Sequence, residues 1–304
     1  MTIYSQISSN KRKSIFLVVI VLVFVIGVVA LYSYSRYQDF SLAILAAILA
    51  IPSSLIGYYT GDKIALAANR AQAVTKEEAP ELTRIIENLA ITAGVPTPKI
   101  YIIQSPAMNA FATGRDPEHA SIAVTTGLLH ALEQSELEGV LAHELSHVKN
   151  YDIRFSTLVA IFVGFIVILS DLVGRSMFFG GGRRSRDNNQ SNALIAIISI
   201  VLLLISPIIA QIIQLAISRQ REYLADSSGA LLTRYPEGLA RALEKIAHSS
   251  PLETASNATA HLFIANPFGS PPARGGVRGG GSSFSGLLST HPPLEERIKR
   301  LREI

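Results

Sequence analysis

Two histidines four positions apart, with a glutamate directly after the first, form the most specific chemical pattern in this chain. The residues are His143, Glu144 and His147. On a helix, side chains four positions apart lie on one face, so both imidazoles can bind one metal ion while the glutamate faces a water molecule on that ion. The pattern predicts a zinc site in which Glu144 is the general base of a hydrolytic reaction.

A catalytic zinc ion needs a third protein ligand and one open position. The sequence offers Glu222, followed by Asp226 four residues later on the same helical face. Asp226 can accept the second ring N–H of a ligand histidine and so fix its tautomer. A solvated acidic face would give the same spacing, and the combination with the histidine pair favours the metal site. Other histidines, such as His261, have no partner at ligand spacing and are expected to be ordinary surface or core residues.

The metal-binding pattern requires a well-defined helix, and the local sequence predicts one. Ser135 and Glu138 have the spacing of a capping box, and apolar residues follow at helical intervals. Residues 75–93 are typical of an amphipathic helix, and residues 99–104 and 121–126 of short strands. An extended substrate can pair with an exposed strand edge, and the segment 121–126 is the predicted edge.

The composition indicates a membrane protein. Of the 304 residues, 49% are hydrophobic and 16% charged, whereas an average soluble domain has about 25% charged residues. The apolar residues gather in four runs, at 14–34, 40–59, 155–173 and 193–217. The first two runs predict a hairpin of two membrane spans. Basic residues beside the runs account for the net charge of +4, so no nucleic-acid partner is expected.

The order of the zinc ligands constrains the last two runs. Both histidines precede the third run and Glu222 follows the fourth, so these runs together cross the membrane an even number of times. Run length favours two crossings with residues 180–182 on the far side, whereas the arginines between Arg175 and Arg186 favour a hairpin that does not cross. The basic amino end of the first run predicts a cytoplasmic catalytic body.

The combined motifs resemble those of the HtpX-type membrane zinc metalloproteases, which are related to the CAAX prenyl proteases. The resemblance covers nearly the whole chain and rests on the histidine pair, on Glu222 with Asp226, and on the segments 109–114 and 291–297. Tyr151 is a departure, because the family usually has glycine at this position just after the metal helix.

The resemblance implies a mainly α, multi-pass membrane protein whose zincin-like α+β catalytic body is interrupted by two hydrophobic helices. The expected divisions are a membrane hairpin at 1–60, a first catalytic part at 61–154, hydrophobic segments within 155–217, and a second catalytic part at 218–304 with a glycine-rich loop at about 266–286. One Zn²⁺ per chain is then bound by His143, His147 and Glu222.

By the same resemblance, further residues acquire expected roles. Glu144 and His291 are catalytic, Asn109 lies near the cleft and binds substrate, and Asp226 and Arg297 support the reacting centre. The implied function is peptide-bond hydrolysis at the cytoplasmic face of the plasma membrane.

The expected partners are the lipid bilayer and polypeptides, above all damaged or misfolded membrane proteins in quality control. Two alternatives remain open: a CAAX-type processing protease and a zinc-binding membrane scaffold without turnover. Glu144 argues against the scaffold, because a site that only binds metal needs no carboxylate between its ligands.

Overall fold

The computed structural model describes residues 3–164, 219–256, 258–269 and 292–304. The fourth hydrophobic run, the second half of the third and most of the glycine-rich loop lie outside the described residues, whereas residues 152–164 are helical. The predictions about their crossing of the membrane therefore stay predictions, as does the division of the chain at these segments.

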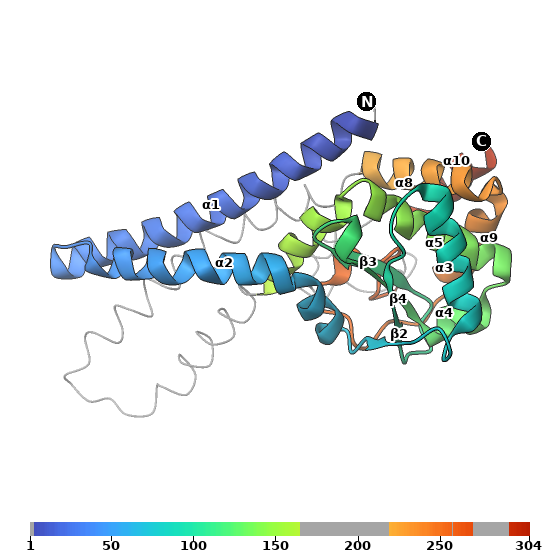
Figure 1. Cartoon of the computed structure of the whole chain (residues 1–304), viewed down its shortest axis with the longest axis horizontal. Coiled ribbons are helices and arrows are strands. Elements are labelled where there is room, and N and C mark those ends of the chain that lie inside the picture. Colours follow the sequence, from blue (N-terminus) through green and yellow to red (C-terminus); the bar gives the residue numbers. More distant parts are fainter. Residues whose placement is uncertain (1–2, 165–218, 257, 270–291) are drawn as a thin grey trace, which may run out of the picture.

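Two long helices form a hairpin that extends from the rest of the molecule (Figure 1). They are α1 (Ile3–Tyr37) and α2 (Ser41–Ala68), and they contain the first two apolar runs. Large apolar side chains project from both, including Phe16 and Val23 of α1 and Ile48 and Ile56 of α2, each more than 60% exposed. Such a surface is typical of contact with lipid.

One helix in the described part of the chain has the length and apolar composition needed to cross a membrane. It is the stretch Ala43–Ala68 in α2, which has a mean hydropathy of 1.6 and is 6% buried over the window tested. A first span within α1, and with it the multi-pass arrangement, stays a prediction.

A small mixed sheet forms the centre of the body that lies at one end of the hairpin, the expected catalytic body. Its strands are β1 (Gln72–Ala73), β2 (Lys99–Ile103), β3 (Ala110–Gly114) and β4 (Ala120–Thr125). Their order in the sheet is β1-β2-β4-β3, with β2 and β4 parallel and the other pairs antiparallel. The two predicted strands are confirmed as β2 and β4.

The predicted substrate edge is wrong. β4 lies between β2 and β3, so both of its edges are hydrogen-bonded and all of its residues are buried. β3 is the outer strand on this side of the sheet. The sequence analysis missed β3, because its composition of alanine, threonine and glycine around Phe111 gives little strand propensity.

Helices surround the sheet, with the metal-binding helix α5 (Gln134–Lys149) between them. The others are α3 (Pro80–Ala93), α4 (Thr126–Ala131), α8 (Arg219–Thr233), α9 (Pro236–Ala247) and α10 (Leu294–Arg302).

The helix predicted at 75–93 is confirmed as α3, starting at Pro80. The capping box of α5 is formed by Glu133 and Glu136, two residues earlier than predicted, because the helix begins at Gln134.

Two glycines allow neighbouring helices to approach α5 closely. A Cβ atom at Gly139 of α5 would lie 2.7 Å from the backbone nitrogen of Leu239 in α9. A Cβ atom at Gly229 of α8 would lie 3.0 Å from the backbone nitrogen of His143 in α5. The second contact holds α8, which carries Glu222, directly against the helix that carries the histidine pair.

Candidate metal centre and active site

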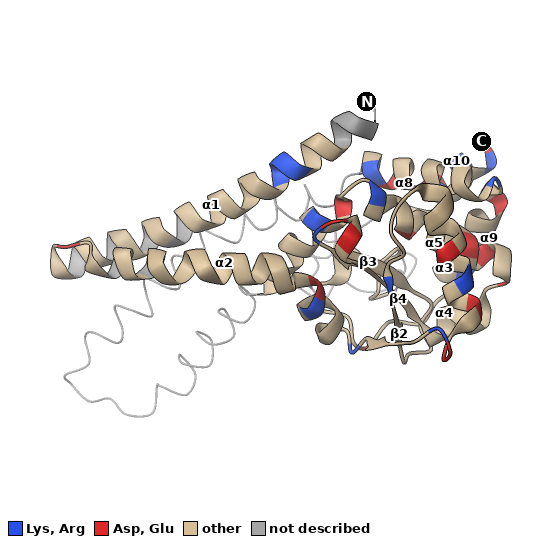
Figure 2. Ribbon diagram, viewed as in Figure 1, with Lys and Arg blue, Asp and Glu red and all other residues tan. Residues whose placement is uncertain are grey.

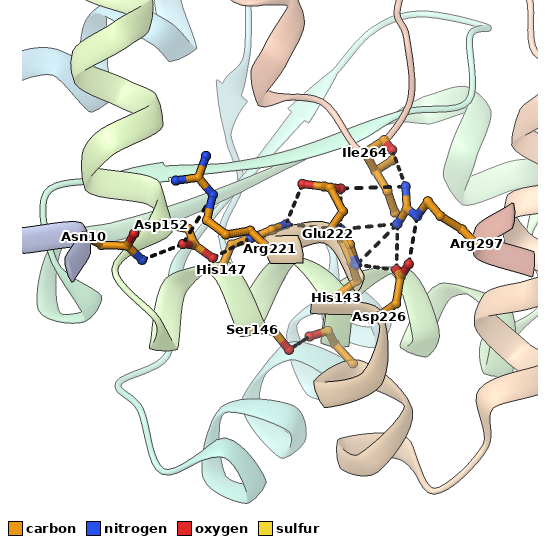
Figure 3. Close-up of polar contacts among 11 residues, drawn as sticks. Asn10, His143, Ser146, His147, Asp152, Arg221, Glu222, Asp226, Ile264 and Arg297 are labelled. Atoms are coloured by element: carbon orange, nitrogen blue, oxygen red, sulfur yellow. Dashed lines mark hydrogen bonds and ion pairs between the residues drawn. The ribbon is translucent and has the colours of Figure 1, made fainter. Parts of the chain in front are cut away.

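Three side chains from two helices converge on one point (Figure 3). The Nε2 atoms of His143 and His147 lie 3.2 Å apart, and each lies 3.7 Å from a carboxylate oxygen of Glu222. One ligand atom from each residue fits within a group no more than 4.8 Å across. Ligands of a tetrahedral zinc ion lie roughly 3.3–3.6 Å apart, given bond lengths of about 2.0–2.2 Å. The donor set therefore fits Zn²⁺.

Each histidine has a carboxylate behind it. Nδ1 of His143 lies 2.9 Å from Asp226, and Nδ1 of His147 lies 3.0 Å from Asp152. A carboxylate at Nδ1 favours the tautomer that carries its proton there, which leaves the Nε2 lone pair directed at the metal position. Asp226 thus lies where the sequence placed it, whereas Asp152 was not predicted.

Arg297 of α10 lies behind the first histidine and is fully buried. Its guanidinium donates two hydrogen bonds to Asp226, at 2.9 and 2.7 Å, and one to the backbone oxygen of Ile264 at 2.9 Å. It also lies 3.8 Å from Glu222. The arginine therefore compensates two buried carboxylates and joins α10 to the metal centre.

Glu144 lies beside the ligands and is 1% exposed. One of its carboxylate oxygens has no hydrogen-bond partner among the described residues. Burial raises the pKa of Glu144 to about 7, with Glu222 acting in the same direction and His147 and Arg297 against it. A carboxylate with a pKa near neutrality is suited to accept and return a proton.

The two histidines differ in their affinity for protons. Burial lowers the pKa of His143 to about 4, against the hydrogen bond with Asp226. Burial also acts against a proton on His147, but the hydrogen bond with Asp152 and the carboxylate of Glu222 outweigh it and raise the pKa of His147 to about 9. Because zinc binds neutral imidazole, metal binding at His147 displaces a proton.

A pocket lies over these groups, and a segment distant in sequence forms one of its walls. The pocket lining includes His261, Phe263 and Ile264 together with the zinc ligands. Phe263 pairs with Phe111 of β3, and the backbone N–H of Ile264 donates to Ala110 at 2.9 Å. His261, expected to be an ordinary residue, lines the pocket, and its Nε2 lies 2.9 Å from the backbone oxygen of Ser156.

Two predicted site residues are not placed among these groups. The amide nitrogen of Asn109 donates to the backbone of Ala265 at 3.1 Å, and its carbonyl oxygen accepts from the N–H of Ala110 at 3.1 Å. Both ends of this amide are engaged within the protein, and its role in substrate binding stays a prediction. His291 lies outside the described residues.

The site also includes residues that the sequence analysis missed. Asp152 lies beyond the end of α5, five positions after His147, and no helical spacing connects the two. Asn10 lies near the start of the chain, yet its amide donates to Asp152 at 2.6 Å. No local pattern in the sequence links Asn10 to a residue 142 positions away.

The comparisons with known proteins agree on one family. The model of peptidase family M48 matches residues 76–304. A "Protease HtpX homolog" from Dictyoglomus turgidum is 45% identical over 303 residues, which cover 99% of this chain and 94% of the relative. One from Caldanaerobacter subterraneus subsp. tengcongensis is 45% identical over 310 residues, covering 100% of this chain and 98% of the relative.

The comparison with solved structures matches this chain to the crystal structure of S. mikatae Ste24p. The TM-score is 0.48 and the sequence identity is 21%. The match covers 94% of this chain, which spans 64% of the length of that protein.

Proposed function

This chain belongs to peptidase family M48 and is a membrane metalloprotease of the HtpX type, and on that premise we propose that it hydrolyses peptide bonds with one Zn²⁺ held by His143, His147 and Glu222. The observation that carries the proposal is the convergence of three ligand atoms beside a buried, partly unpartnered glutamate. A site that only stored metal would have no use for such a carboxylate.

The protein groups divide the chemistry among themselves. When bound, zinc supplies Lewis acidity, which lowers the pKa of water and polarises a peptide carbonyl. Glu144 accepts a proton from the attacking water and returns it to the leaving amine. Asp226 and Asp152 hold the two imidazoles in position, and Arg297 in turn holds Asp226. His291 is retained as a proposed catalytic residue on the resemblance alone.

We place the substrate backbone along the outer edge of β3. Alternate residues of an edge strand direct their backbone groups outward. Ala110 and Gly114 already use such groups, since Ala110 accepts from Ile264 and Gly114 donates to Thr157 at 3.2 Å. Ala112 lies between them and lines the pocket, where its backbone N–H donates to the carboxylate of Glu144. A short extended peptide that pairs with the backbone oxygen of Ala112 would bring its carbonyl to the metal centre.

The substrates proposed are membrane proteins cleaved at the cytoplasmic face of the plasma membrane, as in quality control. The position of the pocket supports this. Its wall residue Phe263 belongs to the same buried cluster as Ala65 and Leu66 at the end of α2, so the cleft lies at the base of the helical hairpin. Ends and loops of damaged membrane proteins would lie at the same level.

Replacing the general base tests the proposed chemistry. Glu144→Gln removes a proton acceptor but no metal ligand, so the purified variant should bind zinc like wild type. Its rate of casein hydrolysis should fall by about 10²- to 10⁴-fold. Glu138→Gln, on the same helix, is the matched control and should keep full activity. Equal hydrolysis by the Glu144 and Glu138 variants would refute the mechanism.

Removing the third ligand gives a different result. Glu222→Ala should lose zinc as well as activity, because two histidines alone bind the ion weakly. Metal content after dialysis, measured by elemental analysis, separates the two variants. Wild-type zinc content in Glu222→Ala would show that another residue is the third ligand.

A further inference from the structure

The amino-terminal helix α1 contacts the turn that follows the metal-binding helix and the first residue of the next helical stretch, 152–164. Asn10 is 2% exposed, and its amide nitrogen donates to Asp152 at 2.6 Å and to the backbone oxygen of Asn150 at 3.0 Å. An amide nitrogen has two hydrogens, and both are used here. The contact is therefore directed at a particular carboxylate rather than being a general packing contact.

The carboxylate that receives this hydrogen bond also holds a zinc ligand. One oxygen of Asp152 accepts from Asn10, and the other lies 3.0 Å from Nδ1 of His147 (Figure 3). Nε of Arg221 lies 3.9 Å from the first oxygen. Asp152 is 3% exposed, so water contributes little to its solvation. Its orientation then depends on these few protein partners.

The turn after α5 contains a residue in a strained backbone conformation. Tyr151 follows the last turn of α5 with φ of 59°, in the left-handed region where glycine is favoured. Glycine would adopt this conformation without strain. The tyrosine side chain contacts α1, because the Lys11 ammonium of that helix lies 4.1 Å from the centre of the Tyr151 ring. Two consecutive residues of α1 thus contact both residues of the turn and the first residue of the helix after it.

We propose that Asn10 is a positioning residue of the metal centre, acting through Asp152 on His147, so that the amino-terminal helix is part of the zinc site. The inference rests on the proposed zinc-dependent function. Groups that hydrogen-bond to a metal ligand from behind typically change metal affinity 10- to 100-fold when they are removed. Asn10 is one hydrogen bond further from the ion, and its removal should cost somewhat less than removal of Asp152.

Zinc affinity of the full-length protein in detergent provides the test, measured by competition with a chromogenic chelator. Asp152→Ala should bind zinc about 10- to 100-fold more weakly than wild type, and Asn10→Ala roughly 3- to 10-fold more weakly. Asn88→Ala, at an exposed position of α3, is the matched control and should bind like wild type. Thermal unfolding of the metal-free proteins shows whether each variant is folded.

A second variant separates hydrogen bonding from packing. Leucine has the same branched arrangement of side-chain heavy atoms as asparagine but cannot donate a hydrogen bond, so the Asn10→Leu variant should bind zinc as weakly as Asn10→Ala. Absorption spectra of the Co²⁺-loaded proteins should show the same altered ligand field in both variants. Wild-type affinity in Asn10→Leu would mean that the residue only fills space and would overturn the inference.

A double-mutant cycle tests the route through Asp152. Once Asp152 is alanine, Asn10→Ala should cause no further loss of zinc affinity, because its effect passes through that carboxylate. Two additive losses would contradict the proposed route. The proposed function fails separately: if wild type binds no zinc, the metal site is wrong, whereas normal binding by both Asn10 variants refutes the role of Asn10 and leaves the protease assignment intact.

Discussion

Arg297 is a fully buried charge, and its environment shows how the metal centre is held together at the scale of single residues. Its guanidinium forms a two-pronged contact with Asp226, which in turn holds His143. The nearby carboxylates offset the desolvation cost of the arginine. Burial acts to raise the pKa of Asp226, but Arg297 and the hydrogen bond with His143 outweigh it and lower this pKa to about 2. Removing either partner would leave the other as a buried charge without full compensation, which is energetically costly.

Removing Arg297 should therefore destabilise the protein strongly. Arg297→Met leaves Asp226 buried beside Glu222 without a positive partner, and we expect a loss of about 3–5 kcal/mol in the free energy of unfolding of the metal-free protein. Zinc should recover part of the loss, because it brings positive charge to the same carboxylates. Denaturant unfolding with and without a chelator measures both effects.

The control for this experiment is Arg300→Met, on the same helix. Arg300 pairs with Glu296 at 3.0 Å, and both side chains are exposed, so the loss should stay within about 1 kcal/mol. Equal losses in the two variants would mean that burial of the Arg297 pair has no special energetic importance.

The zinc ligands could be predicted from the sequence because their spacing is local. His143 and His147 lie one helical turn apart, and so do Glu222 and Asp226. Asp152 could not be found in this way, because α5 ends at Lys149 and Asp152 is the first residue of a separate helical stretch, 152–164. The helical spacing of α5 does not continue across the turn between them.

At the scale of elements, the end of α5 combines a helix terminus with a metal ligand. The helix ends at Lys149, and Tyr151 turns the chain in the left-handed conformation. A side chain with a Cβ atom in this conformation costs about 1 kcal/mol relative to glycine. The cost is offset in part by the contact of the tyrosine ring with Lys11.

Two substitutions at this position separate the backbone from the ring. Tyr151→Gly and Tyr151→Ala both remove the ring contact, but only glycine removes the strain. We expect the glycine variant to be more stable than the alanine variant by about 1 kcal/mol in thermal or denaturant unfolding. At Tyr223, inside α8, the order should reverse, because glycine is the poorer helix former there. The same order at both positions would argue against strain at Tyr151.

Element types were easier to predict than their limits. The pair Ser135 and Glu138 has the same spacing as the pair Glu133 and Glu136, and tertiary contacts decide between them: Lys245 of α9 donates to Glu136 at 2.6 Å. β3 escaped prediction because pairing with β4, rather than its own composition, makes it a strand. The position of β3 at the edge follows from the order of the strands in the sheet, and no local pattern in the sequence reveals that order.

At the scale of the whole molecule, charge and apolar surface are separated. Charged side chains cover the catalytic body and the nearby ends of the hairpin helices, while the middle of each helix has none (Figure 2). Lys11 and Lys13 lie near the start of α1, and Asp62 and Lys63 near the end of α2, where the hairpin meets the body. Arg36 and Asp39 lie at the opposite end, around the turn between the two helices. This arrangement agrees with a hairpin inserted in the bilayer with its basic end in the cytoplasm.

Cysteine labelling tests this orientation directly, because the chain has no native cysteine. Gln38→Cys places a thiol at the exposed tip of the hairpin, and Thr97→Cys places one on the exposed surface of the catalytic body. In intact cells, a membrane-impermeant thiol reagent should label the first and not the second, whereas after lysis it should label both. The reverse pattern would mean an external catalytic body, and equal labelling in intact cells would exclude a hairpin that crosses the membrane.

If α1 spans the membrane as proposed, the contact of Asn10 with the metal centre would fix the height of that centre above the membrane. Asn10 lies four residues before Ser14, where the apolar run begins, which corresponds to about 6 Å along the helix axis. Because α1 is rigid over this length and bonded to the loop behind His147, the scissile bond of any substrate must come to nearly the same level. The enzyme would then select bonds by their distance from the lipid surface more than by their side chains, and loops too short to reach that level would escape cleavage.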